Sequence, residues 1–240
     1  MSLPLALVVP TLNEREHLPR LLESVVDQSE PFDEVVVCDG GSNDGTAEIA
    51  RNAGAIVVVS CPGRGDQIAT GLEAARSSTV LVLHADGRCQ RTTAEAIRRY
   101  FAMHPESPGG CLGHQFDHRR WLLRFVEIAD RRRARKGFSY GDQGQFFRRE
   151  SLELVGGFPR QPIMEDVELT RCLRSLGRLG YLDLPVTCSS RGFDRLGVFG
   201  TILRNRRLRS LYRRHGDSAL QEVLRRYYPN SNPMTRSHTS

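Results

Sequence analysis

The chain has 240 residues, a hydrophobic content of 39% and a formal net charge of +6. These values are ordinary for a water-soluble protein, and the length suits one filled α/β domain with a small appendage. No apolar stretch is long enough to cross a bilayer, so we expect no membrane-spanning helix. Lys136 is the only lysine. The positive charge is therefore arginine, which suits phosphate, acidic membranes and nucleic acid alike.

The cysteines are scattered and contain no C-x-x-C pair, which predicts free thiols in a reducing compartment instead of disulfides or a zinc site. They are Cys38, Cys61, Cys89, Cys111, Cys172 and Cys188. The first residues carry no basic stretch, and the apolar run at 5–9 is too short for a signal peptide. The expected location is the cytoplasm.

Short β-branched runs alternate with amphipathic segments through the first half of the chain. The runs predict buried strands at residues 5–9, 34–38, 56–60 and 80–84. The segments between them predict helices at residues 14–27, 46–53 and 66–75. Asn13 followed by Glu16 predicts a helix N-cap with its capping partner. This alternation favours right-handed crossovers and a mainly parallel sheet.

The second half of the chain is less regular. It predicts helices at 93–104, 119–135 and 166–176, and a short strand at 145–147. An apolar helical face within 119–135 is formed by Trp121, Leu122, Phe125, Val126, Ile128 and Ala129. A basic amphipathic helix is predicted at 198–214, and the polar residues 229–240 are predicted to be disordered.

Polar side chains follow the ends of the four predicted strands. In chain order they are Pro10, Thr11, Asn13, Glu14, Asp39, Asp44, Arg64, His84 and Asp86. Because the carboxyl ends of parallel strands meet at one edge of a sheet, we expect these groups to converge. Such a set of hydroxyl, amide, carboxylate and guanidinium groups can hold a base, a ribose and a diphosphate.

Two common nucleotide-binding signatures are absent. The glycines Gly40 and Gly45 have the outer spacing of a phosphate-binding loop, but its lysine is missing. The pair Gly63 and Gly65 continues to Ile68, where the dinucleotide fingerprint requires glycine. The chain is therefore neither an ordinary phosphate-loop NTPase nor a standard NAD-binding protein.

An ordered set of motifs over roughly residues 5–190 resembles the family 2 glycosyltransferases of the GT-A fold. The motifs are V-V-P-T-L-N-E at 8–14, the segments at 35–46 and 81–86, G-D-Q-G at 141–144, V-G-G-F-P at 155–159 and M-E-D-V-E-L at 164–169. The H-A-D and G-D-Q-G wording resembles a small bacterial branch labelled arsenosugar-biosynthesis glycosyltransferase. The resemblance implies an α/β, Rossmann-like domain at 1–195, divided into a nucleotide-binding half (1–90) and an acceptor half (91–195), followed by a helical extension at 196–228.

The resemblance further implies inverting transfer of a sugar from a nucleoside-diphosphate sugar to an acceptor hydroxyl. Asp166 takes the place of the catalytic base, which must remove the hydroxyl proton, and Glu165 supports its geometry. The start of a helix favours the negative charge of such a carboxylate. Asp39 is expected at the base or ribose. The other residues expected around the nucleotide are Pro10, Thr11, Asn13, Glu14, Arg64 and His84.

A divalent cation, Mg²⁺ or Mn²⁺, is expected at Asp86. An acid at a strand end that faces a diphosphate makes chemical sense when a cation lies between the two. His84 stands where the D-x-D motif of the family has its first acid. The imidazole is expected either to ligate the metal or to form a hydrogen bond with the ribose.

Structural roles are the alternative for these residues. Asp39 and Asp166 can brace a turn or cap a helix, Arg64 can be a solvated surface residue, and Asp44 is expected to brace an Asx-turn. Alternative functions are a nucleotidyltransferase of similar fold and a non-catalytic nucleotide- or lipid-binding module. A metal site at Cys111, His114 and His118 is a weaker alternative.

The basic helix at 198–214 has two interpretations. It either packs against the domain or lies on anionic lipid, which would suit a lipid acceptor as well as a small molecule. Its apolar residues alternate with seven arginines between Arg195 and Arg214. The arginine runs lack interleaved aromatic residues, so nucleic acid is not an expected partner.

Overall fold

Seven strands form one mixed sheet in the computed structural model, which describes residues 3–117, 121–161, 163–193 and 197–215. The strands are β1 (Leu5–Thr11), β2 (Glu34–Asp39), β3 (Ile56–Val59), β4 (Thr79–Val82), β5 (Gly109–Phe116), β6 (Gln145–Arg148) and β7 (Gly180–Cys188). Their order is β3-β2-β1-β4-β6-β5-β7. Only β6 runs antiparallel to its two neighbours among the described strands, so the predicted mainly parallel sheet is confirmed.

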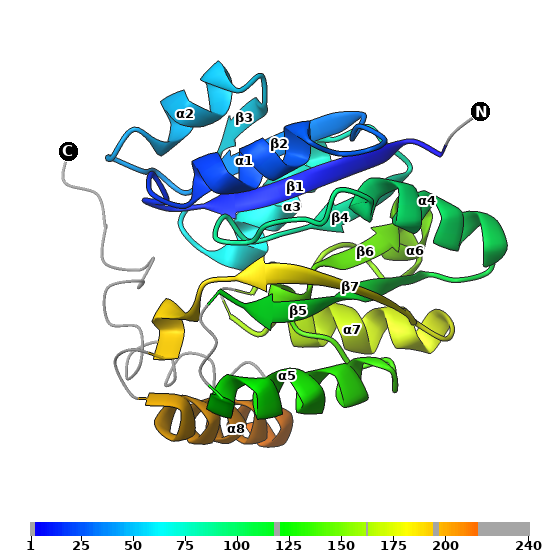
Figure 1. Ribbon diagram of the computed structural model, residues 1–240. Coiled ribbons are helices and arrows are strands. Elements are labelled where there is room, and N and C mark those ends of the chain that lie inside the picture. The colour runs from blue at the N-terminus through cyan, green and yellow to red at the C-terminus, as the bar shows by residue number, and fades with distance from the viewer. Residues whose placement is uncertain (1–2, 118–120, 162, 194–196, 216–240) are drawn as a thin grey trace, which may run out of the picture.

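Helices cover both faces of this sheet (Figure 1). They are α1 (Leu18–Val26), α2 (Thr46–Asn52), α3 (Arg64–Ala74), α4 (Thr93–Met103), α5 (Trp121–Ala134), α6 (Arg149–Leu154), α7 (Glu165–Leu176) and α8 (Gly197–His215). Two short 3₁₀ helices, η1 (Gly141–Gln143) and η2 (Ser190–Phe193), lie on the connections that precede β6 and follow β7.

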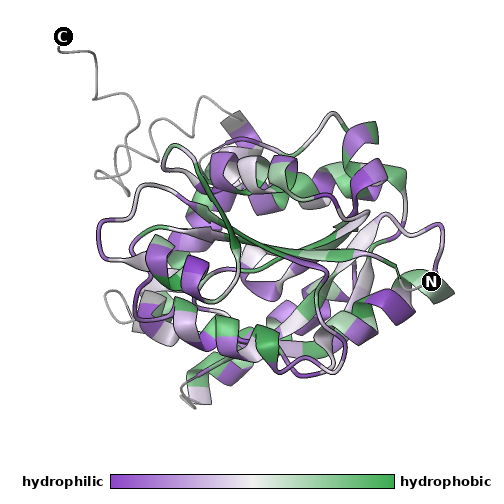
Figure 2. Cartoon of the chain, turned by 90° about the horizontal axis from the view of Figure 1, so that it is seen from above, coloured by the Kyte–Doolittle hydropathy of each residue, from purple (hydrophilic) through white to green (hydrophobic). Residues whose placement is uncertain are grey.

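Alternation along each strand divides the core into two layers. Leu7 of β1 belongs to a cluster with Leu21 of α1, whereas the next residue, Val8, packs with Leu72 of α3 and Leu169 of α7. Both faces of the central strands are therefore buried, as their nearly continuous β-branched sequences predict. Figure 2 shows the sheet as largely hydrophobic between helices that alternate hydrophobic and hydrophilic residues.

Two details of the predicted first half are wrong. The strand β3 is not buried, because it forms the outer edge of the sheet and exposes Ile56 and Val59. Asn13 is not a helix N-cap: it has a φ of 55°, and its side-chain oxygen accepts a hydrogen bond from the backbone N–H of Asn43. The helix α1 begins only at Leu18, after a turn.

The apolar face predicted within 119–135 does not pack into the core. Instead α5 buries Leu123, Asp130 and Ala134, and Oδ2 of Asp130 lies 3.5 Å from Nε2 of the buried His114 of β5. Trp121 and Phe125 remain 68% and 61% exposed. The fold therefore leaves large apolar side chains of α5 on the surface.

The basic helix α8 follows the prediction closely in its bounds. Its inner side buries Val198, Thr201 and Leu208, and Leu208 packs with Ile163, which precedes α7. Packing against the domain is therefore one of its roles. The rest of the predicted extension and the predicted disordered tail at 229–240 lie outside the described residues.

Candidate functional site

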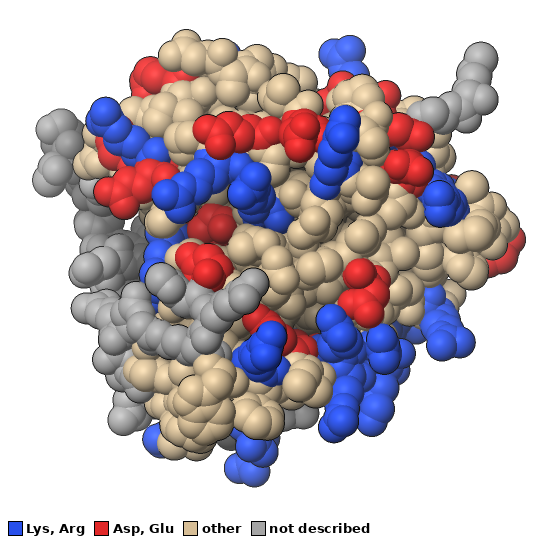
Figure 3. All heavy atoms as spheres, viewed as in Figure 1, with Lys and Arg blue, Asp and Glu red and all other residues tan. Residues whose placement is uncertain are grey.

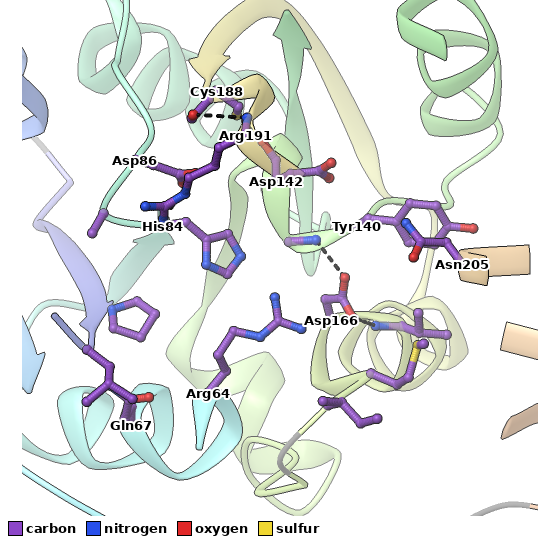
Figure 4. Close-up of a pocket in the computed structure, with 18 of the residues that line it drawn as sticks. Arg64, Gln67, His84, Asp86, Tyr140, Asp142, Asp166, Cys188, Arg191 and Asn205 are labelled. Carbon is purple, nitrogen blue, oxygen red and sulfur yellow. Dashed lines mark hydrogen bonds and ion pairs between the residues drawn. The ribbon is translucent and has the colours of Figure 1, made fainter. Parts of the chain in front are cut away.

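A cavity of 720 Å³ lies beyond the carboxyl ends of β1 and β4, the edge at which the sequence predicts a nucleotide site (Figure 4). The ends of these strands, the start of α3, η1, the start of α7 and one side of α8 line it. The predicted site residues in its lining are Pro10, Thr11, Glu14, Arg64, His84, Asp86 and Asp166. Asn13, Asp39 and Glu165 are not in that lining.

The side chain of Asp39 forms its hydrogen bonds with the glycine-rich loop that follows β2. Its carboxylate is buried and accepts hydrogen bonds from the backbone N–H groups of Gly41, at 3.1 Å, and Ser42, at 2.8 Å. Gly41 has a φ of 91°, which favours glycine at this turn. Asp44 accepts from the N–H of Thr46 and of Arg15, so its predicted bracing role is confirmed.

The first and second halves of the chain (1–90 and 91–195) meet at the start of α3. A Cβ atom on Gly65 would lie 2.2 Å from the backbone oxygen of Gln161, so only glycine fits there. The neighbouring Arg64 contacts the second half too, with its Nε 3.1 Å from Oε1 of Glu165. The predicted nucleotide residue Arg64 is thereby linked to the residue next to the predicted base.

Asp166 is held at the start of α7 by two backbone donors. Its Oδ2 accepts from the N–H of Gly141 at 2.7 Å, and its Oδ1 accepts from the N–H of Val167 at 2.8 Å. A Cβ atom on Gly141 would lie 2.7 Å from Nε2 of His84. Glycine at this position therefore lets η1, β4 and α7 bring His84 and Asp166 to the same part of the cavity.

His84 is a neutral imidazole near neutral pH. Burial, assisted by the positive charge of Arg64, lowers the pKa of His84 to about 4. A neutral imidazole can ligate a metal or hydrogen-bond a ribose. Both roles predicted for His84 remain compatible with this protonation state.

Glu165 is a buried carboxylate beside the cavity, and its side chain is 2% exposed. Its Oε2 has no hydrogen-bond partner within the described part of the chain. Burial raises the pKa of Glu165 to about 7, although Arg64 acts in the opposite direction. Because the pKa of Glu165 differs between the folded and unfolded states, the free energy of unfolding depends on pH.

Replacing Glu165 with glutamine is expected to remove a pH-dependent loss of stability. Between its ordinary value of 4.5 and about 7, an unfolded Glu165 has released its proton while the folded one retains it. The free energy of unfolding therefore falls as pH rises through this window. Calorimetry should show the Tm of wild type falling relative to Glu165→Gln over this range.

Glu168 is the matched control for that experiment, because Arg171 lowers the pKa of this neighbouring glutamate. Its contribution is present above its unfolded pKa and is lost only as pH falls below that value. Glu168→Gln should therefore keep a constant Tm difference from wild type across the Glu165 window. A constant difference for Glu165→Gln as well would contradict the assignment.

Asp86 and Glu14 are two of the carboxylates that line the cavity, together with Asp142 and Asp166. No three His, Cys, Asp or Glu residues cluster as a metal site within the described ranges. Magnesium often binds through one or two carboxylates together with substrate phosphates, and these two acids fit that arrangement. They converge on one point, because both approach the guanidinium of Arg191.

Several lining residues escaped the sequence prediction. Tyr140 has the guanidinium of Arg133 3.6 Å from its ring centre and that of Arg209, from α8, at 4.6 Å. Asp142 belongs to the quoted G-D-Q-G motif but was assigned no role. Burial raises its pKa, with Asp130 acting in the same direction. Asp142 could have been identified as a site residue from the G-D-Q-G motif. Arg191 and the residues of α8 belong to no motif that would have indicated a place in the site.

The alternative metal site is not supported by the part of it that the structure describes. His114 points its Nε2 toward Asp130, at 3.5 Å, and Cys111 is a buried free thiol. His118 lies outside the described residues. The six cysteines are all free, as predicted. No helix of the described chain is both long and apolar enough to span a bilayer.

Residues 6–156 match the family model "Glycosyl transferase family 2". The chain belongs to glycosyl transferase family 2. Glycosyltransferase AglJ of Haloferax volcanii is 31% identical over 191 residues, covering 78% of this chain and 58% of AglJ. A 4,4'-diaponeurosporenoate glycosyltransferase of Staphylococcus aureus is 43% identical over 54 residues, covering 22% of this chain and 14% of that protein.

Solved structures of similar fold support the architecture. The mannosyltransferase PcManGT from Pyrobaculum calidifontis, in complex with GDP-Man and Mn²⁺, gives a TM-score of 0.64 at 24% identity, covering 87% of this chain and 61% of PcManGT. TarS of Staphylococcus aureus, with UDP-GlcNAc, gives 0.63 at 21% identity, covering 79% and 59%. The predicted GT-A fold is confirmed. This chain spans less than two thirds of the length of each of these four proteins.

Proposed function

We propose that this chain transfers a sugar from a nucleoside-diphosphate sugar to an acceptor hydroxyl, with inversion at the anomeric carbon. The observation that supports this most is the position of Asp166. Its carboxylate lines the same cavity as Thr11 and Asp86, which lie at the strand ends where open α/β folds bind nucleotides. The nucleotide sugars bound by PcManGT and TarS support a donor of the same class.

Asp166 is the general base of this proposal. As the acceptor hydroxyl attacks the anomeric carbon, its proton passes to the Asp166 carboxylate and the nucleoside diphosphate leaves from the opposite side. The N–H groups of Gly141 and Val167 hold both carboxylate oxygens in place. Glu165, fixed by Arg64, supports the backbone turn on which Asp166 lies.

Asp86 and Glu14 would hold a divalent cation, and His84 would be a further ligand. Bound Mg²⁺ or Mn²⁺ would offset the negative charge of the leaving diphosphate. PcManGT binds Mn²⁺ together with its donor, which supports the same cofactor class here.

We also propose that the chain belongs to the arsenosugar-biosynthesis branch of the family. The proposal rests on the H-A-D sequence at 84–86 and the G-D-Q-G sequence at 141–144.

The acceptor is a small molecule or a lipid in this proposal. The acceptor end of the cavity combines apolar side chains, such as Ile163 and Leu208, with Arg204 and Arg209 of α8. Such a lining suits an amphiphilic acceptor. The exposed apolar and basic residues of α5 and α8 support peripheral contact with an anionic membrane surface on the cytoplasmic side.

Hydrolysis of nucleotide sugars in the absence of acceptor tests the proposed activity. Many transferases release the donor sugar slowly to water, whereas a binding module does not. UDP, GDP and TDP sugars should be screened with Mn²⁺, and the released nucleotide measured. A nucleotidyltransferase would instead form a nucleotide sugar from a nucleoside triphosphate and a sugar phosphate. Binding without turnover of any donor would favour the non-catalytic alternative.

A further inference from the structure

Arg191 lies between the two carboxylates that the proposed cation would use. It is part of η2, 177 residues along the chain from Glu14. Its Nη2 lies 2.6 Å from Oε1 of Glu14 and 3.7 Å from Oδ2 of Asp86. Figure 4 shows its side chain reaching back across the cavity to Asp86. One guanidinium therefore neutralises two acids that come from the ends of β1 and β4.

The three side chains differ in how far they are exposed to solvent. Glu14 and Asp86 are 17% and 21% exposed, whereas Arg191 is 47% exposed. The Oε2 of Glu14 is buried and has no partner among the described residues, so the guanidinium leaves part of the acidic pair unsatisfied. The two acids are therefore more buried than the guanidinium, which belongs to a short helix beyond the last strand and is about half exposed.

Charge makes this arrangement incompatible with a fully loaded site. A divalent cation at Asp86 would repel a guanidinium at the same carboxylate. A donor would bring two phosphates to the same place, and a guanidinium fork matches phosphate oxygens closely. Arg64, the arginine expected around the nucleotide, also lines the cavity, and its Nε lies 3.1 Å from Oε1 of Glu165.

We propose that Arg191 binds the donor diphosphate by exchanging partners. Without donor it neutralises Glu14 and Asp86. When a nucleoside diphosphate enters, Asp86 would hold the cation that accompanies it, and Arg191 would turn from Asp86 to donate hydrogen bonds to the phosphate oxygens. This inference rests on the proposed nucleotide-sugar function. It assigns a second, protein-supplied positive charge to the leaving group, beside that of the metal.

The test is a pair of equilibrium measurements on Arg191→Gln. Binding of Mn²⁺ alone, followed by the paramagnetic resonance of free Mn²⁺, should become about three- to tenfold tighter, because the competing cation is removed. Binding of UDP, GDP or TDP in saturating Mn²⁺, followed by calorimetry, should become about tenfold weaker, because charged hydrogen bonds to phosphate are lost. A purely structural role would weaken both.

Two further variants make the result specific. Arg88→Gln removes the same charge from an exposed residue outside the cavity lining, and it should change neither affinity. Arg191→Lys keeps the positive charge but lacks the planar guanidinium. Its Mn²⁺ affinity should match that of wild type, and its nucleotide affinity should lie between those of wild type and Arg191→Gln. Unchanged nucleotide affinity or weaker Mn²⁺ binding in Arg191→Gln overturns the exchange. Wild type that binds none of the three nucleotides overturns the proposed function itself.

Discussion

Replacing Asp166 with asparagine is expected to lower sugar transfer by about 10²- to 10⁴-fold, the usual contribution of a general base. Asparagine can accept the hydrogen bonds from Gly141 and Val167 through only one side-chain oxygen, and it cannot take up a proton. The expected loss is therefore in kcat. Binding of the nucleoside diphosphate, measured by calorimetry, should be unchanged because the proposed role of Asp166 is to accept a proton from the acceptor hydroxyl, not to contact the nucleotide.

Asp66 provides the matched control for this variant. It also lies in the first turn of a helix, α3, but it pairs with Arg160 and is outside the cavity lining. Asp66→Asn should retain transfer activity. Turnover at the wild-type rate in Asp166→Asn would remove Asp166 from the mechanism. Loss of nucleotide binding in that variant would indicate that Asp166 mainly maintains the fold between η1 and α7.

The donor side of the site could be predicted because it depends on local sequence. Alternating strands and helices determine a parallel sheet, and a parallel sheet brings its strand ends to one edge. This rule alone is sufficient to predict that Thr11, His84 and Asp86 lie close together. Asp39 satisfies the same rule, but its loop uses the carboxylate for its own N–H groups. Sequence alone does not show whether such a carboxylate is available to a ligand or forms hydrogen bonds within its own loop.

The remaining residues depend on contacts that sequence spacing does not encode. Arg191 reaches Glu14 across 177 residues, and α8 supplies part of the cavity wall. The apolar face of α5 was correctly identified as apolar but not as exposed. Periodicity indicates which residues share a helix face, whereas burial depends on whether another element covers that face. Here a charged residue, Asp130, is buried instead, with its carboxylate 3.5 Å from the imidazole of His114 on β5.

Removing two aromatic side chains from α5 and α8 is expected to abolish most binding to anionic vesicles. Trp121 of α5 and Phe199 of α8 are 68% and 73% exposed, and Leu203 of α8 is 69% exposed. The two helices are neighbours, since Arg133 of α5 and Arg209 of α8 both lie over Tyr140. In Figure 3, basic side chains surround the surface where Figure 1 shows these helices. This combination is typical of interfacial attachment.

The expected effect of Trp121→Ala with Phe199→Ala is a loss of about 10- to 100-fold in vesicle affinity, because each ring would bury apolar area in the interface. Co-sedimentation with phosphatidylglycerol-containing vesicles measures it. Phosphatidylcholine vesicles and added salt should weaken wild-type binding, since the arginines act through screened charge.

Val26→Ala with Val59→Ala is the matched control, because these residues are also exposed but lie on α1 and on β3, at the opposite edge of the sheet from β7. It should bind vesicles as wild type does. If both double variants bind alike, the α5 and α8 surface is not the contact. If wild type does not bind anionic vesicles at all, the acceptor reaches Asp166 from solution, and α8 serves only as a wall of the cavity.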